Sequence, residues 1–188
     1  MTKKVAVFID ASNLWDVQKT RGKMLDFEKL IDYLKDRYKT SSMQVYYYTA
    51  FPADGTRSYD TSRKHKFFTY LEKGLGIIVR KKELKRISST TSRFEDGFVE
   101  KGNMDVELVI DAVHFVKDYD SAILFTGDSD FLGLVKYIRS RGKKVYIYSS
   151  KNSVSSELRT GGDGYIDLLS IDGSIWGREI FYRDQKKR

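Results

Sequence analysis

The sequence predicts an α/β fold in which a mostly parallel sheet carries helices on both faces. Short apolar runs of strand composition alternate with segments of helical spacing along the chain, and such alternation is typical of parallel sheets joined by right-handed crossovers. The 188 residues suffice for one sizeable core and are too few for two ordinary ones. We therefore expect a single folded unit.

The first half of the chain contains three predicted strands. Residues 5–9 form a continuous apolar run, as expected for a strand buried on both faces. Residues 24–38 carry apolar side chains at helical spacing, and residues 44–48 return to strand composition. A basic helical segment, residues 59–73, then ends at two glycines before a third strand begins at residues 77–79.

The second half continues the alternation after an interruption. Residues 85–103 mix Ser, Thr, Gly and charge, which predicts a long loop, and such loops are often functional or disordered. Residues 104–119 are the clearest helix of the chain. A fourth strand at residues 122–125, a helix at 131–141 and a fifth strand at 145–148 follow.

The periodic pattern changes after Leu169. Residues 175–182 predict one last strand, and a basic tail closes the chain at residues 185–188. We therefore divide the chain into a domain over residues 1–169 and a C-terminal extension over residues 170–188.

The charge balance favours an anionic partner. Lys and Arg number 34 against 26 Asp and Glu, which leaves a formal net charge of +8. Nucleic acid is the leading candidate for such a chain. A solvated basic surface without a partner is the alternative.

Cysteine is absent, which excludes disulfides and thiolate metal sites. There is neither a signal peptide nor an apolar run near the roughly 18 residues that a membrane span needs. These features predict a cytoplasmic protein without membrane contact. A metal would have to bind oxygen or the two histidines, and we interpret His65 and His114 as ordinary surface residues.

Two carboxylates are predicted at one edge of the sheet. Asp10 directly follows the first strand, and Asp128 follows the fourth after only Thr126 and Gly127. In open α/β sheets, ligands bind outside the carboxyl ends of the strands. If the strand order is 3-2-1-4-5, strands one and four are neighbours and the two acids face one crevice. Asp130 lies in the first turn of the following helix.

The helix at residues 104–119 adds a third acid. At 100° per residue, Asp105 begins the apolar stripe that includes Leu108 and Ala112 and should pack on the sheet. A carboxylate on the helix face that packs against the sheet requires an explanation. Asp111 falls on the opposite, polar side, which predicts a solvated side chain.

Each acid also has a simpler interpretation. Asp10 could bond the backbone of the next turn, Asp128 or Asp130 could cap a helix, and Asp105 could complement its helix dipole. These simpler interpretations are less convincing when they are taken together, because separate segments would have to bring acids to the same end of one sheet by chance. Clustered carboxylates repel one another unless a cation neutralises them, and hard oxygen ligands suit Mg²⁺ or Mn²⁺.

Three motifs in order resemble the NYN domain, in particular its LabA-like bacterial branch. They are FIDASNLW at residues 8–15, KGNMDVELVIDAV at 101–113 and LFTGDSDFLGLVKYIRSRGKKVYIY at 124–148. SSELRTGGDGYIDL, residues 155–168, looks like the closing segment of that branch. The resemblance spans about residues 3–169.

The resemblance implies a PIN-like, Rossmann-like three-layer α/β/α sandwich with an acidic pocket that holds divalent metal and hydrolyses RNA. Together with the strand pattern, it leads us to expect a five-stranded sheet in the order 3-2-1-4-5. By position, Asp10, Asp105 and Asp128 fall on the metal-pocket acids of the family, with Asp130 as a fourth. Asp111 coincides with another recurrent family acid, which weakens its interpretation as a solvated residue.

The predicted activity is hydrolysis of RNA phosphodiester bonds with Mg²⁺ or Mn²⁺. We expect Asp10, Asp105 and Asp128 to bind the metal and to form the catalytic site together with Asp130. Asn13 is expected to contact the substrate phosphate or to orient Asp10. Other contacts to the phosphate or to a ligand water are expected from Lys101, Ser12 and Thr126.

Binding of RNA, single-stranded or structured, is expected to depend on a basic band, because an acidic pocket repels phosphate. The band comprises Arg57, Arg63, Lys64, Lys66, Arg80, Lys81, Lys82, Lys85, Arg86 and Arg93. The nearby aromatic side chains that could stack unpaired bases are Tyr59, Phe67, Phe94 and Phe98. Alternatively, Phe67 belongs to the core and the basic side chains are solvated.

Two other functions compete with this prediction. A haloacid-dehalogenase-type phosphatase needs a second Asp two residues after its nucleophile, and this chain has Ser12 there. The stronger alternative is a non-catalytic RNA-binding or regulatory protein with a vestigial or structural metal pocket. Such a protein could act through a protein partner or as a homodimer.

Overall fold

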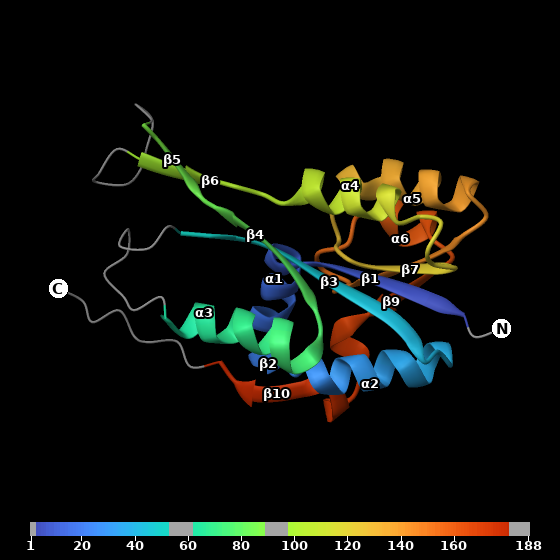
Figure 1. Ribbon diagram of the computed structural model, residues 1–188, viewed down its shortest axis with the longest axis horizontal. Coiled ribbons are helices and arrows are strands. Elements are labelled where there is room, and N and C mark those ends of the chain that lie inside the picture. The colour runs from blue at the N-terminus through green and yellow to red at the C-terminus, as the bar shows by residue number, and fades with distance from the viewer. Residues whose placement is uncertain (1–2, 53–61, 89–97, 181–188) are drawn as a thin grey trace.

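The protein is built on a six-stranded parallel sheet with the order β4-β3-β1-β7-β8-β9 (Figure 1). The computed structural model describes residues 3–52, 62–88 and 98–180. The strands are β1 (Lys4–Asp10), β3 (Ser42–Phe51), β4 (Ile78–Glu83), β7 (Ser121–Phe125), β8 (Lys144–Ser149) and β9 (Gly164–Asp167).

The predicted fold class and the order of the five predicted strands are confirmed, but the sheet has one strand more than expected. The additional strand is β9, which pairs in parallel with β8 at the edge of the sheet. Its four residues, GYID, are all only half-buried. A short edge strand of this kind lacks the apolar run by which the central strands are detected.

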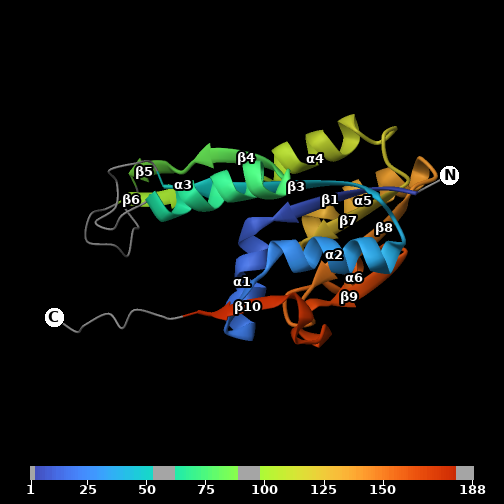
Figure 2. The same cartoon turned by 60° about the horizontal axis from the view of Figure 1, so that its bottom comes forward.

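Helices cover both faces of the sheet (Figures 1 and 2). One face carries α1 (Ala11–Arg21), α2 (Phe27–Tyr38) and α3 (Ser62–Thr69). The other carries α4 (Asp105–His114), α5 (Leu132–Ser140) and α6 (Ser156–Gly161).

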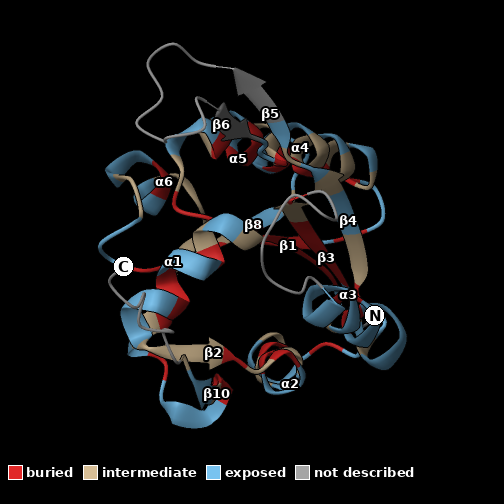
Figure 3. Ribbon diagram, turned by 90° about the vertical axis from the view of Figure 1, so that its left-hand side faces the viewer, coloured by how far each residue is buried: buried red, intermediate tan, exposed pale blue. Residues whose placement is uncertain are grey.

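The central strand β1 contributes to two separate cores. Val7 and Ile9 pack in the core beneath α1, α2 and α3, whereas Ala6 and Phe8 pack in the core beneath α4 and α5. The rings of Phe8 and Tyr46 stack with their centroids 5.2 Å apart. Figure 3 shows β1 and β3 buried at the centre of the molecule. Burial on both faces explains why the strand is apolar throughout.

Helix α1 was not predicted, although its ends carry ordinary signals. Asp10 caps its N-terminus, and Gly22 ends it with a φ of +74°, a conformation that favours glycine. The predicted helix at 24–38 is shorter because residues Lys23–Leu25 form the short strand β2.

Two other segments differ from their predictions. The helix expected over 104–119 ends at His114, and the Tyr119 hydroxyl then donates to the carbonyl of Ala112, which ties the following turn back to the helix. The segment expected to be one long loop contains β5 (Lys85–Ser88) paired antiparallel with β6 (Phe98–Lys101). The Ser, Thr and charged residues of this segment give no regular apolar alternation, so the sequence pattern did not reveal the hairpin.

The described part of the basic segment predicted at 59–73 begins with α3 and continues as a π-helical turn, Tyr70–Gly74. Gly76 follows with a φ of +66°, so the chain turns there into the third predicted strand.

The C-terminal extension adds a strand outside the main sheet. β10 (Trp176–Glu179) pairs antiparallel with β2, beside α1 (Figure 2). Ile175 and Trp176 are buried in the core beneath α1 and α2. The strand expected at 175–182 is thus shorter than predicted, and the basic tail at 185–188 lies outside the described residues. Among the helices that the structure describes, none combines the length and apolarity needed to cross a bilayer.

Candidate functional site

The candidate site lies where β1 and β7 end side by side. The two strands pair in parallel, with Ile9 opposite Phe125. Asp10 is therefore the last residue of β1, and Thr126, Gly127 and Asp128 continue from β7 at the same edge. The predicted adjacency of strands one and four is confirmed, and it brings Asp10 and Asp128 to the same edge of the sheet.

Asp10 is only 7% exposed and is held by three hydrogen bonds. Its Oδ1 accepts from the Ser12 backbone N–H at 2.9 Å and from the Ser12 hydroxyl at 2.8 Å. Its Oδ2 accepts from Asn13 Nδ2 at 2.5 Å. Asp10 thus bonds the backbone of the next turn, as its simpler interpretation predicted, and that turn is the start of α1, of which Asp10 is the N-cap. Both of its oxygens are held.

Asn13 connects the ends of the two strands. While its Nδ2 donates to Asp10, its Oδ1 accepts from the backbone N–H of Gly127 at 3.0 Å. Of the two roles considered for Asn13, the structure shows a contact to Asp10. The same amide sets the position of the turn that carries Asp128.

Asp128 caps the helical turn that follows it. Its Oδ1 accepts from the backbone N–H of Asp130 at 3.0 Å, while Asp130 is exposed. Of the two acids that could cap the helix, Asp128 is the one that does, because a cap accepts from the N–H groups that follow it. Thr126 is buried, and its Oγ1 accepts from the Asp128 N–H at 3.2 Å, which argues against direct contact with a substrate.

Asp105 opens α4 within the electrostatic field of the other acids. Burial, together with the charges of Asp10, Asp128, Asp130 and Glu107, raises the pKa of the Asp105 carboxyl. Asn103 Nδ2 donates to Asp105 Oδ2 at 2.7 Å. The structure thus places Asp105 within electrostatic range of each of the other three predicted catalytic acids, Asp10, Asp128 and Asp130.

These acids provide the donors that a hard divalent cation requires. Carboxylate oxygens suit Mg²⁺ and Mn²⁺, and a cation would offset the burial and the repulsion that together raise the pKa of Asp105. Within residues 3–52, 62–88 and 98–180, no three His, Asp or Glu side chains stand together as a preformed metal cluster. The chemistry of the donor set fits the metal, although the side chains are not arranged as a closed ligand sphere.

Asp111 is not solvated, contrary to its predicted place on the polar face of the helix. Its side chain is 15% exposed, and its Oδ2 accepts from Arg80 Nε and from the Tyr48 hydroxyl, each at 2.9 Å. Burial and the nearby carboxylate raise the pKa of Tyr48, so the hydroxyl stays protonated and donates. Asp111 therefore joins α4 to β3 and β4.

Some side chains of the predicted basic band form ion pairs within the protein. Lys82 Nζ lies 2.8 Å from Glu107 Oε1, and Arg80 pairs with Asp111. His65 and His114 are exposed, as expected. The other predicted positions whose side chains lie outside the described part of the structure are Arg57, Tyr59, Arg86, Arg93, Phe94, Phe98 and Lys101.

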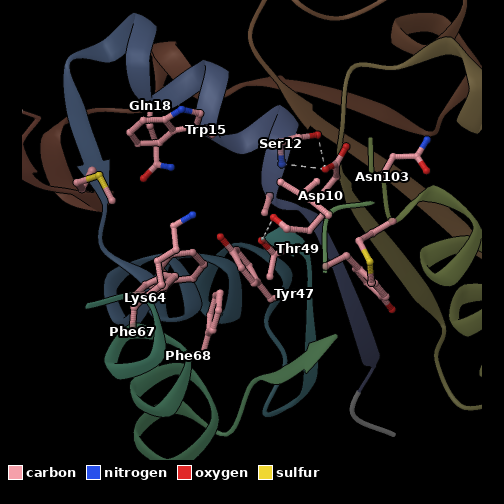
Figure 4. A pocket seen from close by; sticks show the side chains of 18 residues that line it. Asp10, Ser12, Trp15, Gln18, Tyr47, Thr49, Lys64, Phe67, Phe68 and Asn103 are labelled. Atoms are coloured by element: carbon pink, nitrogen blue, oxygen red, sulfur yellow. Dashed lines mark hydrogen bonds between the residues drawn. The ribbon is translucent and has the colours of Figure 1, made fainter. Parts of the chain in front are cut away.

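A pocket of about 460 Å³ adjoins Asp10 (Figure 4). Among the lining residues that sequence reasoning missed are Trp15, Gln18 and Tyr47. Trp15 and Gln18 continue the three-residue spacing that starts at Ser12, which places all three on one side of α1. That spacing is a usable signal only once residues 11–21 are recognised as a helix.

The comparisons with known proteins agree with this fold. The family model described as NYN domain matches residues 4–169. The low amplitude and bright protein LabA of Synechococcus elongatus is 29% identical over 172 residues, which cover 92% of this chain and 87% of that protein. A crystal structure of VPA0982, a protein of unknown function from Vibrio parahaemolyticus, has the same fold. It superposes with a TM-score of 0.69 at 22% identity and covers 93% of this chain and 96% of that one.

Proposed function

The chain belongs to the NYN domain family, a PIN-like nuclease family, and from this premise we propose that it is a divalent-metal-dependent ribonuclease. One observation carries the proposal. The pKa of Asp105 is raised by burial and by the carboxylates of Asp10, Asp128 and Asp130, which come from two other segments of the chain. A cluster of acids that repel one another at the end of a parallel sheet is an arrangement suited to bind a cation.

Asp10, Asp105 and Asp128 are the proposed ligands of Mg²⁺ or Mn²⁺, and Asp130 adds negative charge beside them. When bound, such an ion supplies an activated water and offsets negative charge on the reacting phosphate. Ser12 and Asn13 hold both oxygens of Asp10, and Asn103 holds one oxygen of Asp105. These contacts reduce the reorganisation that ligand binding would otherwise require.

RNA is the proposed substrate. The net charge of +8 favours a polyanion, and Lys64 lies in the pocket beside Asp10. Lys101, which precedes Asp105 on the chain, is proposed as a second phosphate contact. Ser12 is exposed next to Asp10, so its hydroxyl could also reach a substrate oxygen.

The alternative function is RNA binding without cleavage, and one observation favours it. Asp10 and Asp128 each cap a helical segment, a role that needs no metal and would preserve both acids in an inactive protein. In that case the acid cluster would be a structural feature, and the protein would act by binding RNA or a protein partner.

Cleavage of labelled RNA separates the two functions. Wild-type protein is incubated with single-stranded RNA in Mn²⁺, in Mg²⁺ and in EDTA, beside Asp105→Asn. Asp105 makes no cap contact of its own, so this variant should fold. Asp36→Asn is the matched control, because its side chain is 81% exposed on α2.

The ribonuclease proposal expects metal-dependent cleavage that Asp105→Asn abolishes and Asp36→Asn retains. Cleavage that persists in Asp105→Asn would contradict the proposed site. Tight RNA binding without cleavage in either metal would instead support the alternative.

A further inference from the structure

The pocket beside Asp10 has features that the acid cluster does not explain. Asp10, Ser12 and Asn103 form one end of it, so it adjoins the candidate metal site at Asp10 (Figure 4). Its volume of about 460 Å³ lies within the range of about 300–1,000 Å³ typical of pockets for small organic groups.

Aromatic side chains from four elements line this pocket. Trp15 comes from α1, Phe27 from α2, Tyr47 from β3, and Phe67 with Phe68 from α3. The ring centroid of Phe27 lies 5.6 Å from that of Tyr47 and 5.7 Å from that of Phe67. These rings support one another and form a rigid wall.

Trp15 differs from the other rings because it is exposed. It is 41% exposed, among the large apolar side chains that the described structure leaves at the surface. An indole beside a pocket with a free face is suited to stack on a planar group. Tyr70, also on the surface at 46%, does not line this pocket.

The polar groups of the pocket are few and oriented. Gln18 is 6% exposed, and its Oε1 accepts from the backbone N–H of Leu25 at 2.7 Å. That bond orients the amide, so Nε2 is the end that can donate to a ligand. Figure 4 shows Gln18 and Lys64 extending into the cavity from opposite sides, from α1 and α3.

The charge of the pocket favours a neutral ring over a phosphate. Asp10 and Lys64 are the two formally charged side chains among its lining residues, and they offset one another. A planar, uncharged group with hydrogen-bond acceptors would stack on the rings and accept from Gln18. Lys64 would then pair with a phosphate attached to that group.

We propose that this pocket receives one unpaired nucleobase of RNA, next to the phosphate held at the acid cluster. This inference rests on the proposed function, because it assigns the substrate class of that site. A base in a duplex would first have to leave its stack and its partner, so the pocket selects single-stranded RNA. Stacking on aromatic side chains tolerates every base, so no sequence preference is implied.

Fluorescence of Trp15 tests the proposal without any cleavage. The chain has two tryptophans, and Trp176→Phe leaves Trp15 as the only one. The probes are a single-stranded oligoribonucleotide, the same strand in a duplex, and a strand of equal charge with abasic sugars, all titrated in EDTA. A base stacked on the indole should quench its emission saturably.

We expect quenching by the single strand and little by the duplex or the abasic strand. Equal quenching by all three probes would overturn the proposal, because quenching would then depend on the charge of the strand and not on an unpaired base. If Trp176→Phe does not fold, fluorescence polarisation of a labelled strand replaces the measurement. Trp15→Ala should then weaken RNA binding about tenfold or more. The control Tyr70→Ala should bind RNA as the wild type does. Equal affinities of the two variants for RNA would also overturn the proposal.

The outcome can be separated from that of the proposed function. Quenching without RNA cleavage in Mn²⁺ would support the base pocket and contradict the ribonuclease. Metal-dependent cleavage of single and double strands at equal rates, without quenching, would support the ribonuclease and contradict the base pocket.

Discussion

Asn13 Oδ1 accepts a hydrogen bond of 3.0 Å from the backbone N–H of Gly127, across a separation of 114 residues in the chain. The Nδ2 of the same amide donates to Asp10. One side chain therefore sets the relative position of the two strand ends that carry Asp10 and Asp128.

Asn13→Ala is expected to weaken both the fold and metal binding. It leaves the Gly127 N–H without its acceptor and Asp10 Oδ2 without its donor, which should lower the free energy of unfolding by about 1–3 kcal/mol. Urea unfolding measures the first effect and Mn²⁺ titration by calorimetry the second. Asn152→Ala, at an exposed turn position, is the control. An Asn13→Ala protein as stable as the control would contradict the expected role of Asn13 in joining Asp10 to Gly127.

Gly127→Ala tests how tightly the Asp128 turn is packed. A Cβ at this position would lie 2.4 Å from the carbonyl oxygen of Ser153 and 2.7 Å from Ser149 Oγ. We expect a loss of about 1–3 kcal/mol in the free energy of unfolding, because the backbone must shift.

Gly133→Ala is the matched control, since its Cβ would meet no atom within 4 Å in α5. That change should raise stability by about 0.5–1 kcal/mol, because alanine favours helix. Similar stabilities for the two variants would show that the Asp128 turn relaxes freely.

Asp111→Ala should destabilise the protein without affecting metal binding. It removes the acceptor of the buried Tyr48 hydroxyl and the partner of Arg80. An unsatisfied buried donor costs about 1–3 kcal/mol. Asp118→Ala, at an exposed position after α4, is the control for stability. Loss of Mn²⁺ binding in a stable Asp111→Ala protein would instead place this acid in the metal site.

Asp163 should make stability depend on pH in the acid range. Burial tends to raise its pKa, but hydrogen bonds from Lys144 Nζ and the Val145 N–H, with the charges of Lys144 and Arg139, lower it overall. The folded-state pKa thus lies below the unfolded value of about 3.9. The ionised Asp163 carboxylate therefore stabilises the folded protein above the unfolded-state pKa, and this stabilisation is lost as pH falls through the folded-state pKa.

Asp163→Asn should accordingly be less stable than the wild type at pH 7, and the difference should shrink below about pH 4. Urea unfolding at a series of pH values measures it. Asp36→Asn, an exposed substitution, should show no such convergence. A difference between Asp163→Asn and wild type that stays constant down to pH 2 would contradict the assignment.

Lys64→Gln should reduce the salt dependence of RNA binding. If Lys64 neutralises one phosphate of a single strand, its loss should lower the slope of log affinity against log salt by about 0.7. Lys35→Gln, exposed on α2 and not among the pocket residues, should leave the slope unchanged. Equal slopes for the two variants would remove Lys64 from the phosphate contacts.

The fold and the edge that carries the acids could be predicted from sequence because both depend on local patterns. The apolar run of β1 reports burial on two faces, and parallel strands bring their carboxyl ends to one edge. Asp10 and Asp128 follow such runs directly. Elements without a strong period, such as β9 and the hairpin of β5 and β6, escaped prediction for the same reason.

By itself, the sequence determined that acids from three segments lie toward one edge of the sheet, because strand ends and helix faces follow from short-range periodicity. Only the tertiary structure decided what each acid contacts: Asp128 caps a turn, and Asp111 binds Tyr48 and Arg80. It also assembled the pocket of Trp15, Gln18 and Lys64 beside Asp10. Those relationships join residues far apart in the chain, and packing, which no local pattern encodes, sets their distances and burial.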